Sequence, residues 1–225
     1  MPIATIISVL NFLSGAVSFM ISYFAYKNNR VIGNVLLKYI SIGLLLLGVG
    51  LILQAVTESV LGTTAVEALK VRGVDLTAFL VYTALQLIAY AVIARGYGLS
   101  AYRSPQGVAA SMPSFLLASA TVTRRLLEYI VLVLAVYIAS QAGIVILLLI
   151  IVLQGVSVFS HTRSNLALMV LFGFALIFIG HLLMLGAALA LASGVFLVGN
   201  TIEFCGFVSL LFFLIWSGRV GKRET

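Results

Sequence analysis

The chain has 225 residues, of which 63% are hydrophobic and 8% are charged, and its mean hydropathy is +1.24. Soluble domains are about 45–50% apolar and about 25% charged, so most of this surface must face lipid. The composition excludes a soluble fold and predicts an all-α, multi-pass protein of the cell membrane, with residues 1–225 forming one integral membrane domain. The net charge of +7 therefore bears on orientation in the bilayer, and no nucleic-acid partner is expected.

Metal-binding and nucleophilic motifs are scarce. One cysteine and two histidines exclude an internal disulfide, a CxxC site and a multi-histidine metal site. The chain contains no HExxH motif, no nucleophile elbow and no phosphate-binding glycine loop. The last apolar run has no lysine that could hold a retinal Schiff base. We therefore expect no metal, no cofactor and no enzymatic activity.

The breaks between apolar runs predict a bundle of seven transmembrane helices, because each crossing needs about 20 mostly apolar residues. The expected spans are Ile3–Tyr26, Asn34–Thr57, Leu76–Ala94, Thr123–Ser140, Gly143–Ser160, Leu166–Ala192 and Val195–Ser217. Only Ser140-Gln141-Ala142-Gly143 divides the fourth from the fifth. As one helix these two would run roughly 50 Å against a hydrocarbon core of about 30 Å, so we predict a tight hairpin there.

The positions of the basic residues predict the orientation, because cytoplasmic loops are enriched in Lys and Arg. With the N-terminus outside and the C-terminus cytoplasmic, most basic residues fall in four inner segments: Lys27–Arg30, Arg95–Arg125, His161–Arg163 and Arg219–Thr225. A six-span alternative would place the basic tail outside. Within the second inner segment, residues 95–122 are expected to form a cytoplasmic loop or an interfacial helix.

Spans two and five share residues at corresponding positions, among them Gly43 with Gly143 and Gln54 with Gln154. Because these spans run in opposite directions in the seven-span scheme, an inverted repeat of three plus three helices followed by a seventh is one interpretation. Chance matching among common apolar residues is the other.

Polar residues inside the spans mark helix faces that avoid lipid. His181 and Glu203 lie on consecutive spans joined at Ser193–Gly194. They are expected roughly 18 and 14 Å below the outer surface, and Gln86 at roughly 15 Å, at about 1.5 Å per residue. Asn200 precedes Glu203 by one helical turn. The sequence thus predicts a polar layer near the middle of the membrane.

Two interpretations of the His181–Glu203 pair stay open: a structural hydrogen bond between helices, and a titrating site. Burial disfavours a lone charge and a charged partner favours one, so the pair can be neutral or zwitterionic, as a proton-handling site requires. The functional hypothesis places Glu203, His181, Asn200 and Gln86 in a substrate or proton site. Possible polar lining comes from Asn11, Gln54 and Gln154.

The leading hypothesis is a small polytopic membrane protein that moves, gates or senses a small solute or proton through this site. One alternative is a non-catalytic membrane subunit or assembly partner of a larger complex, because small-residue faces suit helix association. Such a face is formed in the first span by Ser8, Asn11, Ser14, Gly15, Ser18 and Ser22. Another alternative function is that of a seven-helix membrane sensor without its own output domain. Besides the lipid bilayer, the expected partners are copies of this chain or other membrane subunits.

Overall fold

The computed structural model describes residues 3–61, 74–102, 126–190 and 193–220, and these ranges contain six α-helices. The helices are α1 (Ile3–Ile32), α2 (Val35–Leu61), α4 (Val74–Tyr102), α5 (Leu126–Thr162), α6 (Asn165–Ala190) and α7 (Ser193–Val220). All six are long and apolar enough to cross a membrane. The chain is therefore a multi-pass helical membrane protein, although the predicted count of seven helices is not confirmed.

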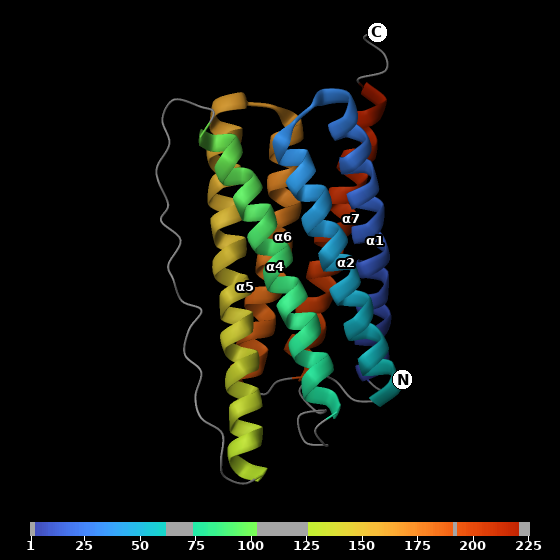
Figure 1. Cartoon of the computed structure of the whole chain (residues 1–225), viewed down its shortest axis with the longest axis vertical. Helices are drawn as coiled ribbons and strands as arrows, with labels where there is room; N and C mark the ends of the chain where they lie inside the picture. Colours follow the sequence, from blue (N-terminus) through green and yellow to red (C-terminus); the bar gives the residue numbers. More distant parts are fainter. Residues whose placement is uncertain (1–2, 62–73, 103–125, 191–192, 221–225) are drawn as a thin grey trace.

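The predicted hairpin between spans four and five is wrong, because residues 126–140 of the fourth span and all of the fifth lie on the single helix α5. Ser140 donates to the carbonyl of Tyr137 on its own helix, and Gln141 reaches His181 on α6. The polar residues that interrupt the apolar run are thus satisfied inside the bundle and need no turn. At 37 residues the helix is about 55 Å long and exceeds the hydrocarbon core, and it extends past its neighbours in Figure 1.

Other predicted segment boundaries also differ from the helix ends in the structure. Residues 95–102, expected to begin a cytoplasmic segment, continue α4 as helix, whereas residues 103–122 lie outside the described ranges. Arg124 and Arg125, assigned above to an inner segment, also lie outside them. The first helix extends beyond its predicted end at Tyr26 and stops at Ile32, where Gly33 adopts a φ of 66° and donates to the Asn29 carbonyl. Gly33 favours this termination because glycine tolerates left-handed backbone.

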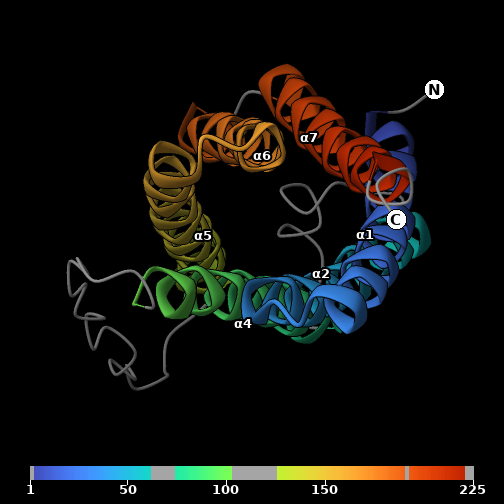
Figure 2. The same ribbon diagram turned by 90° about the horizontal axis from the view of Figure 1, so that it is seen from above.

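The helices form a ring in chain order, closed by contact between α1 and α7 (Figure 2). Their directions follow from residues that face each other. Gly143 on α5 faces Leu87, and Gly98 on α4 faces Gln154, so α4 and α5 run in the same direction. Tyr102 and Leu126 therefore lie at opposite ends of the bundle, and α1 begins at the end opposite to that where α7 finishes (Figure 1). We call these the N-terminal end and the C-terminal end.

The ring divides into two units of three helices, α1–α2–α4 and α5–α6–α7. Both units run first away from the N-terminal end, then back, then away again (Figure 1). Of the two interpretations of the residues shared by spans two and five, this arrangement does not fit the inverted repeat, because the two units have the same sequence of directions and α2 and α5 occupy different positions in them.

Small residues bring the antiparallel neighbours close together. A Cβ on Gly199 would lie 2.9 Å from the carbonyl oxygen of Gly180, and one on Gly206 would lie 2.9 Å from that of Gly173. These pairs allow α6 and α7 to pack backbone against backbone, as small residues commonly do in membranes.

The serine stripe of α1 packs against α2. Ser22 donates to the Ser41 carbonyl at 2.8 Å, and Ser41 donates to the Ser22 carbonyl at 2.9 Å. Ser8, nearer the N-terminal end, donates to the carbonyl of Ala55 at 2.8 Å. The polar face that the sequence marked in the first span is therefore a helix-packing face.

Candidate functional site

A layer of polar side chains lies between two apolar clusters in the bundle interior. The cluster toward the N-terminal end contains Ile7, Tyr82, Tyr137, Met184, Ala187, Ala188 and Phe196. The larger one toward the C-terminal end includes Ala89, Ile144, Ile177 and Phe207. Each of α4, α5, α6 and α7 places a buried polar residue with a long side chain between members of the two clusters: Gln86, Gln141, His181 and Glu203. These four side chains are buried.

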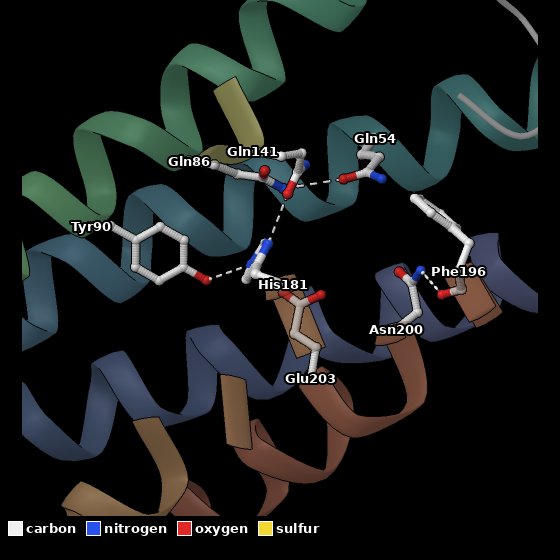
Figure 3. Close-up of polar contacts among 8 residues, drawn as sticks. All are labelled: Gln54, Gln86, Tyr90, Gln141, His181, Phe196, Asn200 and Glu203. Carbon is white, nitrogen blue, oxygen red and sulfur yellow. Dashed lines mark hydrogen bonds and ion pairs between the residues drawn. The ribbon is translucent and has the colours of Figure 1, made fainter. Parts of the chain in front are cut away.

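The centre of this layer is His181, which is 2% exposed and has three polar neighbours (Figure 3). Its Nδ1 lies 3.1 Å from Oε1 of Gln141. Its Nε2 lies 3.2 Å from the hydroxyl of Tyr90 and 3.4 Å from Oε1 of Glu203. The site therefore joins α4, α5, α6 and α7 through one imidazole ring.

These contacts restrict the protonation states of His181. With the carbonyl oxygen of Gln141 on Nδ1, that nitrogen must carry a hydrogen, because an amide oxygen only accepts. In the neutral ring Nε2 is then an acceptor, and Tyr90 donates to it. In the cationic ring Nε2 is a donor, and the carboxylate of Glu203 is within ion-pair distance. One nitrogen thus serves two partners in two charge states.

Nε2 of His181 and Oε1 of Glu203 lie within ion-pair distance, but the two atoms do not have the geometry of a hydrogen bond. Oε1 of Glu203 is completely buried and has no hydrogen-bond partner among the described residues, although Nε2 lies 3.4 Å away. The short distance and the missing hydrogen bond are consistent with each other if the lone pair of Nε2 already accepts the Tyr90 hydroxyl. Buried polar atoms usually have a partner, so this oxygen is an unusual feature of the site.

Close packing of α6 on α7 positions the pair. Gly180 directly precedes His181, and a Cβ at this position would lie 2.9 Å from the backbone nitrogen of Glu203. Without a side chain there, the two helices approach closely enough for His181 and Glu203 to meet. The short connection between the two spans predicted this pairing from the sequence.

Sequence reasoning missed Gln141 and Tyr90 as site residues. Gln141 was assigned to a turn that does not form. Read as part of one helix, its polar group in the middle of an apolar run would have marked it as an interior residue. Tyr90 was not among the predicted site residues: its ring belongs to the larger apolar cluster, as expected of an aromatic residue in a span, but its hydroxyl contacts His181.

A second polar network lies within the first three-helix unit. Glu58 on α2 is 3% exposed and accepts hydrogen bonds from Asn11 at 2.9 Å and from Gln54 at 3.1 Å. Gln54 in turn accepts from Gln86 at 3.1 Å (Figure 3). The structure thus brings Asn11, Gln54 and Gln86 together, but around Glu58, which directly follows the predicted end of the second span at Thr57.

Two predicted site residues do not join these networks. The Asn200 side chain donates to the carbonyl of Phe196 on its own helix at 2.8 Å (Figure 3). Gln154 lies beside Gly98, farther toward the C-terminal end, and its Oε1 has no partner among the described residues. Neither side chain makes a described hydrogen bond to His181 or Glu203.

In the described ranges, no group of three or more His, Cys, Asp or Glu residues is arranged to hold a metal ion. No protein-family model, curated protein or solved structure matches the chain.

Proposed function

We propose that this protein moves, gates or senses a small solute or proton through the site around His181, and that the proton is the species bound there. The observation that carries the proposal is the position of His181 Nε2, which lies between the Tyr90 hydroxyl and Oε1 of Glu203 at 3.2 and 3.4 Å. A nitrogen with an O–H donor on one side and a carboxyl group on the other has a partner in either protonation state.

The proton step proposed for this site is a transfer from the Glu203 carboxyl to His181, after the Tyr90 hydroxyl has turned away from Nε2. The O–H bond of Glu203 breaks and an N–H bond forms at Nε2, which leaves a carboxylate and an imidazolium. Gln141 accepts the Nδ1 hydrogen before and after the transfer and so keeps the ring in one orientation. The unpartnered Oε1 of Glu203 is the atom that faces the imidazole in this step.

The apolar clusters on both sides support a gating role. A proton at His181 is separated from each end of the bundle by closely packed apolar side chains, and apolar constrictions of this kind close a pathway by excluding water. Passage of a proton through the bundle then requires the two apolar clusters to open one at a time. A polar site between two barriers is the arrangement that controlled proton movement needs.

Proton flux in reconstituted liposomes tests this proposal. A pH-sensitive dye inside the vesicles would report acidification after an imposed pH gradient. We expect Glu203→Gln and His181→Ala to slow the flux at least about tenfold, which corresponds to about 1.4 kcal/mol. Thr201→Val is the matched control, because Thr201 is exposed on α7 and its described hydrogen bond is to the Leu197 carbonyl of its own helix.

A sensor would bind the proton without passing it on, so infrared difference spectra complete the test. In spectra recorded as the pH is varied, wild type should show a carboxyl band that changes with pH and that Glu203→Gln removes. The proposal is wrong if wild type shows neither flux nor such a band. It is also wrong if both site variants behave like wild type.

A further inference from the structure

The second buried carboxyl group, Glu58, is not used by the proton step described above. Both of its oxygens are occupied by amide donors, Oε2 by Asn11 and Oε1 by Gln54. The three side chains come from α1 and α2 and are buried. This arrangement solvates an ionised carboxylate with N–H dipoles.

No cationic side chain forms a described ion pair with Glu58; the ion pair in the described ranges joins His181 and Glu203. The titratable groups that face Glu58 are Tyr82 on α4 and Tyr137 on α5, both of which interact with it electrostatically. From α1, the facing group is the neutral amide of Asn11. An ionised carboxylate inside a membrane protein is costly to bury, so binding a proton is favourable if the O–H can be satisfied.

Asn11 can satisfy that O–H. Its amide makes one described hydrogen bond, to Glu58, whereas the amide of Gln54 is also held by Gln86. If the Asn11 amide turns over, its oxygen replaces its nitrogen and accepts a hydrogen bond from a protonated Oε2. Gln54 continues to donate to Oε1. Both described hydrogen bonds of the carboxyl group are thereby kept in both protonation states.

We propose that Glu58, with Asn11 as the amide that turns and Gln54 as a fixed donor, is a second proton-binding site. It lies closer to the N-terminal end of the bundle than the His181 site, since α2 ends at Leu61, three residues after Glu58. The second site stands on its own contacts and does not depend on the function proposed for Glu203. Helix α4 contacts both networks, because it carries Gln86 in the Glu58 network and Tyr90 in the His181 site, one turn apart.

Infrared difference spectroscopy of single and double variants separates the two sites. Between about pH 5 and 9, we expect Glu203→Gln to keep one titrating carboxyl band that is lost in the Glu58→Gln, Glu203→Gln double variant. Loss of all titrating carboxyl bands in Glu203→Gln alone would overturn this proposal while supporting the first. A band in Glu203→Gln that persists in the double variant would also overturn it.

A variant that keeps Glu58 tests the role of Asn11 and covers the case in which Glu58→Gln fails to fold. In the Glu203→Gln background, Asn11→Leu removes the acceptor of the O–H, so the carboxyl band should shift to higher frequency. Ser22→Ala is the matched control, because it removes a hydrogen bond between the same two helices toward the C-terminal end and should leave the band in place. An unshifted band in Asn11→Leu would contradict the proposal.

Discussion

His181 has a separate role for each ring nitrogen. Nδ1 contacts the Gln141 oxygen, which fixes the tautomer, and Nε2 is left for Tyr90 and Glu203. The other histidine, His161, is exposed at the end of α5 and bonds to the Ser157 carbonyl of its own helix. The same residue type therefore has an interior polar role in one case and a helix-end role in the other, and burial decides which.

Nitrogen NMR of ¹⁵N-histidine-labelled protein can check the tautomer of His181. In a His161→Ala background the remaining signals belong to His181, and we expect the neutral ring to carry its hydrogen on Nδ1. Gln141→Leu removes the acceptor and should give a mixture of tautomers. Ser140→Ala should not, because Ser140 bonds to the Tyr137 carbonyl of its own helix. An unchanged spectrum in Gln141→Leu would show that Gln141 does not hold the ring.

At the scale of helices, the glycines of α6 and α7 decide how closely the two halves of the site approach. Gly173 and Gly180 on α6 oppose Gly206 and Gly199 on α7, and each added Cβ would press against backbone atoms or a buried side chain. Backbone atoms move only if the helices separate. Glycine at these positions is required by the neighbouring helix and not by a turn.

Substitution of Gly180 by alanine tests this packing. A Cβ there would lie 2.8 Å from the Gly199 oxygen, so we expect a loss of about 1–3 kcal/mol in the free energy of unfolding, as in other overpacked interiors. Gly186→Ala on the same helix meets nothing within 4 Å and should be stabilising by roughly 0.5–1 kcal/mol. Detergent unfolding curves compare the two, and equal stability of both variants would contradict the close packing.

Over the whole molecule, charge is distributed unequally between the two ends. The Lys and Arg residues of the described ranges all lie toward the C-terminal end: Lys27, Arg30, Lys38, Arg95, Arg163 and Arg219. The acidic Glu58 and Asp75 lie toward the other end. This asymmetry, read with the positive-inside rule, favours a cytoplasmic C-terminal end.

We therefore expect the two termini on opposite sides of the membrane. Reporter fusions at each terminus test this: a fluorescent protein that folds only in the cytoplasm should be bright at the C-terminus and dark at the N-terminus. Two bright or two dark fusions would contradict the arrangement of the helices. A bright N-terminal fusion with a dark C-terminal fusion would contradict only the predicted orientation. Replacing Lys27 and Arg30 by glutamine should weaken the preference for a cytoplasmic C-terminal end.

The sequence by itself determined the class of the protein and much of its polar interior. Apolar runs of membrane length require helices, because lipid offers no partner for backbone hydrogen bonds. The short connection between two spans also paired His181 with Glu203, since consecutive antiparallel helices must pack together. The same reasoning placed Gln86 in the polar layer, although its hydrogen bond is to Gln54.

Only the tertiary structure decided which polar residues are satisfied by a neighbour. Ser140 and Gln141 interrupt an apolar run, and hydropathy alone cannot distinguish a turn from an interior contact. The partner of Gln141 lies on α6, 40 residues away, so no local pattern contains it. Glu58 was missed for the same reason: near a helix end it resembles a solvated residue, and only the approach of Asn11 from α1 makes it an interior carboxyl.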